Sequence, residues 1–306
     1  LRPCVVFAER FAAMSWVMEH WGFGANILPG QTVKDRLRHA IAEVGRFSAA
    51  PRTIYTHTGW RRIGGAWVYL YQGGAIGAQG VSVELEGKLS RLYCFTRAEH
   101  DPPAAMRASL GLLSALPGHI AFPLLCTMYL APLREWFRSN PPAHVLFLYG
   151  GTGTGKSTAA ALFLTHFSDQ ASAKGAAASF EETANALRLK AFWTKDAPFL
   201  VDDFHPVGSI KERKDMSDKA QALSRSFGDN AERGRMTADG RLRVEKPPRS
   251  IGMISWDDLP DIGQSSSARY FIVEVKEGDV LKCPALDASS VPVATASMPG
   301  HDGLYS

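Results

Sequence analysis

The stretch "LYGGTGTGKSTAAALF" (residues 148–163) decides the fold of this chain. Its residues 150–157 match G-x-x-x-x-G-K-[ST], with an apolar run before them and helix-forming residues after them. In this pattern a glycine-rich turn aims backbone N–H groups at a phosphate, and the next helix adds the positive end of its dipole. The sequence therefore predicts a strand, a phosphate-binding loop and a helix, in that order.

The predicted loop assigns contacts to ATP and Mg²⁺. We expect Lys156 to reach the β- and γ-phosphates and Ser157 to ligate Mg²⁺. The other residues expected to contact the nucleotide are Gly150, Gly151, Thr152, Gly153, Thr154, Gly155 and Thr158.

Strands and helices alternate around this loop. Five apolar segments are expected as strands: 144–150, 175–179, 197–204, 250–255 and 269–275. Because strands that alternate with helices form parallel sheets with covered faces, we expect an α/β P-loop NTPase core. Ser179 and Glu182 predict a capping box for the helix that follows them.

The strand "FLVDDF" (199–204) ends in two carboxylates. Parallel sheets bind ligands at the carboxyl ends of their strands, which predicts Asp202 and Asp203 beside the phosphates. We expect Asp202 to bind Mg²⁺ together with Ser157, and Asp203 to polarise the attacking water. The alternative is that both aspartates merely lie at the surface.

Two more residues are candidates for contact with the γ-phosphate. Ser255 ends the strand "SIGMIS", and Trp256, Asp257 and Asp258 are alternatives for the same role. Arg269 precedes the last strand. It is expected either to stabilise transition-state charge in a neighbouring subunit or to form a surface ion pair.

The segment 231–249, "AERGRMTADGRLRVEKPPR", is basic and contains the hairpin turn Asp239-Gly240. Basic side chains around such a turn suit a nucleic-acid backbone. The residues expected to contact DNA, single-stranded for preference, are Arg235, Arg241 and Arg243. A solvated surface hairpin is the alternative.

The rest of the chain divides by composition. A small α/β domain is expected over 1–98, with two helices, a hairpin at Gly64-Gly65 and a second hairpin formed by 81–87 and 89–95. Trp60 and Trp67 are interpreted as core residues, with a base-stacking surface as the alternative. The segments that follow are a helical connector (99–143), the ATPase core (144–280) and an irregular tail (281–306).

Composition restricts the class of protein. The 306 residues are 45% hydrophobic and 21% charged, as in soluble globular proteins, and the net charge of +4 permits a nucleic-acid partner without requiring one. The four cysteines form no C-x-x-C pair, which argues against a zinc site and a disulfide framework. The apolar run 119–133 is too short for a membrane span and predicts a buried helix. We therefore expect a cytoplasmic protein without membrane contact.

Five segments together resemble a known family: "GGTGTGKST", "EETANALRLKAF...APFLVDDF", "NAERGRMTADGRLR", "PPRSIGMISWDDLP" and "GQSSSARYFIVEV". The set is similar to the AAA+ ATPases of phages and mobile elements, akin to the helicases of staphylococcal cassette chromosomes and, more distantly, to MCM ring helicases. The segment "YTHTGWRRIGGAWVYLYQGGAIG" resembles the module that precedes the ATPase in those proteins.

The resemblance implies roles for particular residues. It implies that Asp202 and Asp203 form the Walker B motif, that Ser255 is the sensor and that Arg269 is an arginine finger acting across a subunit interface. It also implies that the Asp239-Gly240 hairpin lies in the pore of a hexamer. The chain departs from the family in two respects: Walker B ends Asp-Asp rather than Asp-Glu, and no helical lid follows Val275.

These observations favour an ATP-hydrolysing DNA motor, a helicase or translocase of a mobile element that acts as a homo-oligomeric ring. A second hypothesis is an ATP-dependent switch that loads or remodels replication proteins without unwinding DNA. A small-molecule phosphotransferase is a third. It is disfavoured because no substrate lid is recognisable after the acidic strand.

Overall fold

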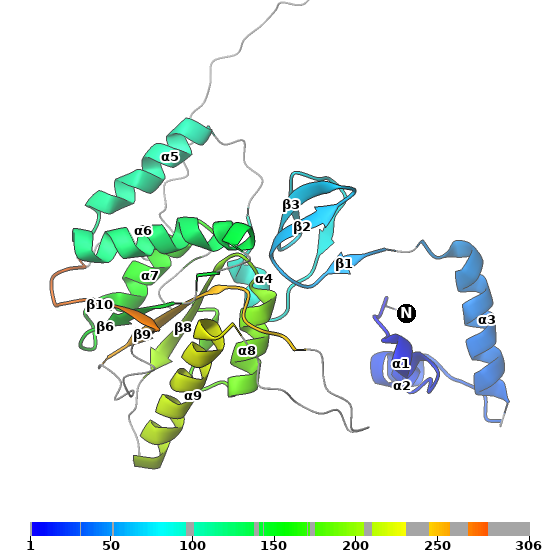
Figure 1. Cartoon of the computed structure of the whole chain (residues 1–306). Coiled ribbons are helices and arrows are strands. Elements are labelled where there is room, and N and C mark those ends of the chain that lie inside the picture. The colour runs from blue at the N-terminus through cyan, green and yellow to red at the C-terminus, as the bar shows by residue number, and fades with distance from the viewer. Residues whose placement is uncertain are drawn as a thin grey trace, which may run out of the picture. The chain divides into compact units, whose positions relative to one another are not determined.

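The structure is a computed structural model of the whole chain, drawn in Figure 1. It describes residues 2–30, 32–50, 52–95, 101–137, 141–142, 144–169, 171, 175–204, 210–230, 245–257 and 269–280, with 203–204 and 210–213 described as backbone only. The chain forms two compact units, Leu1–Thr53 and Ile54–Ser306. The nucleotide motifs all belong to the second unit.

The first unit is helical in its described residues. Its elements are α1 (Ala8–Phe11), α2 (Trp16–Trp21), the 3₁₀ helix η1 (Gly22–Gly24) and α3 (Val33–Ser48). Three buried residues, Met14, Trp16 and Val17, form its core. The ring of Trp16 stacks on Phe11 and meets Trp21 edge-on. Thr32 precedes α3 as expected, but its side chain makes no capping hydrogen bond.

The second unit begins with small sheets. Strands β2 (Gly59–Ile63), β3 (Ala66–Tyr71) and β4 (Gly74–Ile76) form an antiparallel sheet, and β1 (Ile54–Tyr55) pairs in parallel with β5 (Ser82–Val83). The hairpin at Gly64-Gly65 is confirmed. Both glycines have positive φ, at +58° and +86°, as a tight two-residue turn requires.

The second predicted hairpin is wrong. Residues expected as its second strand form the short helix α4 (Leu89–Leu92). Leu89, Leu92 and Tyr93 are buried at spacings of three and four residues, which places them on one face of a helix. That helical spacing outweighs the β-propensity of the aromatic and apolar residues.

Helices then lead to the ATPase-like core. They are α5 (Pro102–Gly111), η2 (Leu112–Ser114), α6 (Gly118–Leu133) and η3 (Arg134–Phe137). The apolar run 119–133 forms α6, as predicted, and buries one face that includes Ile120, Leu124 and Met128. No helix in the described part of the chain is long and apolar enough to cross a membrane.

The core is a five-stranded parallel sheet. Its strands are β6 (Val145–Tyr149), β7 (Ala178–Ser179), β8 (Pro198–Phe204), β9 (Ile251–Trp256) and β10 (Tyr270–Glu274). They lie in the order β10-β6-β9-β8-β7. Strand β9 thus separates the strand before the glycine-rich loop from the strand that carries the two aspartates.

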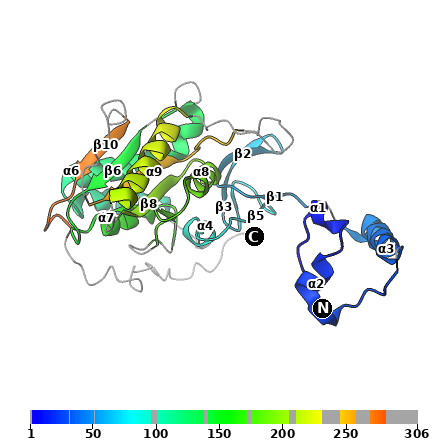
Figure 2. The ribbon, with the colours of Figure 1, turned by 90° about the horizontal axis from the view of Figure 1, so that it is seen from below.

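Helices cover both faces of this sheet, as Figure 2 shows from below. α6 and α7 (Lys156–Leu164) pack on one face, and α9 (Ile210–Gly228) packs on the other, beside α8 (Ala184–Trp193). The predicted α/β class with a parallel sheet is confirmed. The expected capping box is not formed, because α8 begins at Ala184 and Thr183 caps it by accepting a hydrogen bond from Ala186 N at 3.3 Å.

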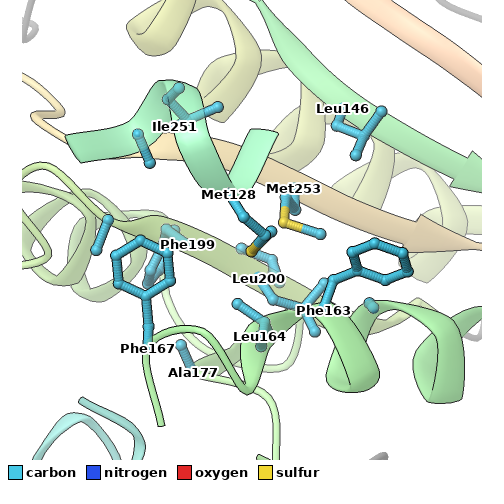
Figure 3. Packing of buried hydrophobic residues seen from close by; sticks show 14 of the residues in the cluster. Met128, Leu146, Phe163, Leu164, Phe167, Ala177, Phe199, Leu200, Ile251 and Met253 are labelled. Atoms are coloured by element: carbon cyan, nitrogen blue, oxygen red, sulfur yellow. The ribbon is translucent and has the colours of Figure 1, made fainter. Parts of the chain in front are cut away.

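Strand pairing sets which side chains meet in the core. Met253 of β9 lies in register with Leu146 of β6 on one side and with Leu200 of β8 on the other. Figure 3 shows these side chains together with Met128 of α6 and Phe163 of α7. Since side chains alternate between the faces of a strand, Ser255 and Asp202, two residues further along, begin on this same face.

The antiparallel sheet belongs to the core unit rather than to a separate domain ending at residue 98. Tyr69 Oη donates to Asp196 O at 2.8 Å, and Tyr93 Oη donates to Pro198 O at 2.6 Å. Trp60 packs edge-on against Tyr69, and its Nε1 donates to Pro132 O at 2.8 Å. The structure therefore divides the chain at Thr53, because these contacts join residues 54–95 to the parallel sheet.

Candidate nucleotide-binding site

The loop between β6 and α7 has the strand–loop–helix arrangement that the motif predicts. β6 ends at Tyr149, and α7 begins at Lys156 with Gly155 at its N-cap. Gly155 has a φ of +92°, a left-handed conformation that costs glycine little. Thr154 Oγ1 donates to Gly151 O at 2.9 Å and tightens the turn. The amino end of α7, with its unpaired backbone N–H groups, therefore opens onto the loop.

The Lys156 side chain lies within this loop and is 6% exposed. Its Nζ donates to Gly150 O at 2.6 Å, to Gly151 O at 3.0 Å and to Asp257 Oδ1 at 2.9 Å. An ammonium group has three N–H donors, so these acceptors use all of them. A phosphate oxygen that approaches Lys156 must replace at least one of the three.

Asp257 joins both sides of the loop. It is the first residue after β9, and its Oδ2 accepts a hydrogen bond from Thr152 Oγ1 at 2.8 Å. The sequence offers Asp257 only as an alternative to Ser255. Ser255 itself is 3% exposed within β9, so the residue that the structure brings to Lys156 is Asp257. Strand pairing decides this, because β9 runs beside β6 and delivers the residue after its end to the loop.

The two aspartates of β8 lie at an irregularity in the sheet. Val201 pairs with Ile254 and Phe204 with Trp256, so that Asp202 and Asp203 together lie opposite Ser255 alone. Such a bulge re-aims the side chains beside it and is common next to functional sites. Because β8 is parallel to β6 and β9, it brings both aspartates to the edge of the sheet that carries the loop.

The residues at this edge fit a magnesium ion that arrives with a nucleotide. Ser157 follows Lys156 in α7, and Asp202 is half-buried at the end of β8. Mg²⁺ takes oxygen ligands and is usually held by one or two carboxylates together with substrate phosphates. No group of three or more His, Cys, Asp or Glu residues in the described ranges is arranged to hold a metal without such help.

The chain after β10 packs against the glycine-rich loop. A Cβ atom on Gly150 would lie 2.0 Å from Val275 O, and one on Gly155 would lie 2.6 Å from Val280 Cβ. A turn follows β10, in which Lys276 N donates to Asp279 Oδ2 at 2.8 Å. These two glycines are thus required by close approach of another segment as well as by the turn. The irregular tail expected from residue 281 onward lies outside the described residues.

Arg269 lies at the opposite edge of the sheet. Its carbonyl oxygen accepts from Val145 N at 2.9 Å, at the amino end of β6. At about 3.3 Å per residue, the strand separates its backbone from the loop by roughly 16 Å. Its Nη2 lies 2.7 Å from Asp229 Oδ1, so the surface ion pair considered from the sequence is formed. Arg269 therefore does not reach the glycine-rich loop of its own chain.

The basic segment expected to contact DNA lies largely outside the described residues. Residues 231–244, which include Arg235, Arg241 and Arg243, belong to that part. The ends of the segment are described. Arg134 Nη2 donates to Asn230 Oδ1 at 2.8 Å and to Pro248 O at 3.2 Å, so one guanidinium group holds both ends.

No protein-family model matches the chain, and no curated protein matches it. A solved structure described as SCCmec type IV Cch, an active helicase, is similar to it with a TM-score of 0.50 and 13% sequence identity. The parallel core has the fold of a helicase ATPase. The match covers 82% of this chain and 45% of that protein, so the chain spans less than half of the helicase it resembles.

Two other solved structures are more distant. The C-terminal region of NrS-1 has a TM-score of 0.39 at 13% identity, covering 81% of this chain and 54% of that one. The JCV helicase has a TM-score of 0.31 at 14% identity, covering 58% and 45% of the two chains. Similarity this low adds nothing to the fold assignment.

Proposed function

We propose that this chain is an ATPase that binds ATP with Mg²⁺ and uses its hydrolysis to move along single-stranded DNA, as a ring-forming helicase or translocase of mobile-element type. One observation carries the proposal. Lys156, Asp257 and the two aspartates of β8 meet at one edge of a parallel sheet with a helicase fold, whereas Arg269 lies at the other edge.

The roles proposed for the nucleotide edge follow from its chemistry. Lys156 exchanges a carbonyl or carboxylate acceptor for phosphate oxygens, and the amino end of α7 adds backbone donors. Ser157 and Asp202 hold Mg²⁺, which neutralises charge on the phosphates. Asp203 orients the attacking water. Asp257 or Ser255 reports the state of the γ-phosphate through β9.

The position of Arg269 supports a ring. A residue roughly 16 Å from its own loop assists hydrolysis only in a neighbouring subunit, and repeated head-to-tail contacts of this kind close into rings. Opening of the Arg269–Asp229 ion pair, which is partly exposed, would release the guanidinium group for that contact. Hexameric order and the DNA contacts of Arg235, Arg241 and Arg243 belong to the same proposal.

The proposal is tested by measuring ATP turnover with and without single-stranded DNA, over concentrations that span assembly. Lys156→Ala is the active-site variant. Lys214→Ala, which removes an exposed lysine of α9, is its control. We expect DNA to stimulate turnover in the wild type and in the control, and turnover to be lost in Lys156→Ala.

Two outcomes would change the proposal. Turnover that is indifferent to DNA, in a chain that forms oligomers, would favour the switch that loads or remodels replication proteins. Phosphate transfer to a metabolite instead of release to water would favour the phosphotransferase. An unwinding assay on a forked duplex then separates the motor from the switch, because only the motor separates strands unaided.

A further inference from the structure

A cluster of cationic side chains lies where the antiparallel sheet meets the parallel sheet. We call Arg61, Arg134 and Arg249 the arginine cluster. Arg61 projects from β2, Arg134 begins η3, and Arg249 precedes β9. Burial lowers the pKa of Arg249 to about 10; Asp196 opposes this, while the charges of Arg61 and Arg134 lower it further. The three guanidinium groups therefore repel one another across the junction.

The carboxylates at this junction are directed to a fourth cation instead. Asp196 Oδ2 lies 2.6 Å from Lys195 Nζ, and Glu135 Oε2 lies 2.7 Å from the same atom. Within the described ranges, no ion pair links a carboxylate to any member of the arginine cluster. Arg134 Nε is also buried without a hydrogen-bond partner in that part of the chain. The cluster therefore carries an excess of positive charge that an anion would relieve.

Aromatic rings support two of the three arginines. The Arg249 guanidinium carbon lies 3.8 Å from the centroid of the Phe192 ring, and its Nε donates to Phe192 O at 2.9 Å. The Arg61 guanidinium carbon lies 5.8 Å from the centroid of the Tyr55 ring. Stacking on a ring fixes the plane of a guanidinium group while leaving its terminal N–H donors available to a ligand. Arg249 uses only its Nε–H on a described acceptor.

His57 lies in the same place as an uncharged group. Its Nδ1 is 2.7 Å from Thr58 O, which assigns the ring proton to Nδ1 and leaves Nε2 as an acceptor. Burial, with smaller contributions from the charges of Arg249, Lys195 and Arg61, lowers the pKa of His57 to about 4. The histidine therefore stays neutral at physiological pH, and the arginines supply the charge.

The combination selects one class of ligand. Guanidinium groups with fixed planes bind phosphate through paired hydrogen bonds, and adjacent rings accept stacked bases. The site lies at the amino ends of β8 and β9, the edge opposite to the glycine-rich loop, so a nucleotide bound at that loop does not occupy it. A polymer with regularly spaced phosphates and unpaired bases satisfies both features.

We propose that Arg61 and Arg249, stacked on Tyr55 and Phe192, bind the phosphodiester backbone of single-stranded DNA. This inference deepens the proposed function, on which it rests, by placing a DNA contact on the antiparallel sheet and in the residues that precede β9. It assigns a role to the segment of residues 54–63, in which the sequence indicates no catalytic group.

The test is fluorescence anisotropy of labelled oligo-dT with the full chain in EDTA and without ATP, repeated across a salt series. Arg61→Gln and Arg249→Gln each remove one phosphate contact, and Arg91→Gln removes an exposed arginine of α4 as the control. For single strands, each lost contact lowers the log–log salt slope by about 0.7. We expect the dissociation constant to rise about fivefold to tenfold at low salt for each variant and to stay unchanged for the control.

A second variant guards against misfolding. Arg249 is half-buried, but Arg61 is exposed, so Arg61→Glu reverses the charge without disturbing the core. Its expected loss of affinity exceeds that of Arg61→Gln. Thermal melting and circular dichroism check that each variant folds.

Results of three kinds would overturn the inference. They are unchanged affinity and salt slope in both Arg61 variants, absence of oligo-dT binding by the wild type, and competition by duplex DNA as strong as that by oligo-dT. ATP turnover separates this from failure of the proposed function. Lys156→Ala should abolish turnover without changing oligo-dT affinity, whereas Arg61→Gln should keep basal turnover.

Discussion

Lys156 Nζ lies 2.9 Å from Asp257 Oδ1, and this ion pair joins the first residue of α7 to the first residue after β9. The carboxylate occupies one of the ammonium donors that a phosphate chain would use. Binding of a nucleotide is therefore an exchange of ligands on Lys156, and its affinity reflects the strength of both partners.

Removing the charge of Asp257 should strengthen nucleotide binding. Asp257→Asn retains the size of the side chain but weakens its attraction for Lys156, so we expect the dissociation constant for ADP to fall about threefold to tenfold. Titration with a fluorescent ADP analogue measures this, and Asp215→Asn in α9 is an exposed control. Weaker binding in Asp257→Asn would mean that the carboxylate holds the nucleotide rather than competing with it.

The glycines of the loop should differ in their tolerance of alanine. Gly150→Ala places a methyl group against the backbone carbonyl of Val275, whereas Gly153 has nothing within 4 Å of an added Cβ atom and only an unfavourable φ of +83°. We expect Gly153→Ala to lose about 1 kcal/mol and Gly150→Ala to lose more, roughly 2–3 kcal/mol, because backbone must move. Urea unfolding of the two variants compares them directly. Equal losses would show that the segment after β10 yields without cost.

Asp196 should be the most stabilising carboxylate of the junction. It is 1% exposed, has a φ of +52°, and accepts hydrogen bonds from Lys195 Nζ and from Trp60 N. Breaking a buried pair of this kind costs about 3–5 kcal/mol, so Asp196→Ala should lower the free energy of unfolding by that amount. Asp196→Asn, which keeps an acceptor for Trp60 N and tolerates positive φ, should lose less.

An exposed ion pair provides the comparison for Asp196. Asp35 and Arg38 lie on the surface of α3, with side chains 65% and 41% exposed. Asp35→Ala should change stability by less than about 0.5 kcal/mol, because exposed pairs contribute little. Chemical denaturation of both alanine variants decides the matter, and a small loss for Asp196→Ala would contradict the network.

Stability should fall as the pH drops through the range set by His57. Its pKa is about 4 in the folded chain against 6.5 for the unperturbed group. The unfolded chain therefore binds a proton first, and the contribution of His57, complete above pH 6.5, is lost progressively down to about pH 4. His57→Asn, whose amide can still donate to Thr58 O, should make the free energy of unfolding depend less steeply on pH over this range. An unchanged slope would assign the dependence to other groups, among them His144 and His166, whose pKa values are lowered mainly by burial.

Arg269 and Lys156 should complement each other in mixtures. If Arg269 acts on a neighbour, Arg269→Ala and Lys156→Ala are each inactive alone, but mixed oligomers contain interfaces with one intact residue of each kind. Random mixing in equal amounts makes about a quarter of the interfaces complete, so roughly that fraction of turnover should return. Asp229→Asn, which removes the partner of Arg269 within the chain, should retain turnover. Failure of the mixture to recover activity would argue against the contact between subunits.

Local patterns predicted much of the fold, because several signals agree along short stretches. The loop before α7 and the hairpin at Gly64-Gly65 depend on glycine conformations that few other residues adopt. α4 was mistaken for a strand because its four residues are too few to display a period. Only burial in the folded chain shows that Leu89 and Leu92 share a face.

Contacts between distant residues could not be predicted in the same way. Tyr69 and Asp196 are separated by 127 positions, and nothing in either neighbourhood indicates their hydrogen bond. The extent of the core unit was missed for that reason. At the candidate site, the sequence located the end of β9 but not which of its four last residues faces Lys156, because that depends on pairing with β6.

The hold of Arg134 on Asn230 and Pro248 bears on how a connecting segment contributes to binding. Bringing two ends of a chain together costs conformational entropy that grows slowly with the number of residues between them. Here the meeting of the ends is already part of the folded unit, fixed by a side chain at the start of η3. A partner that binds between positions 230 and 248 therefore meets a loop whose closure entropy was lost during folding, and more of the energy of contact remains as affinity.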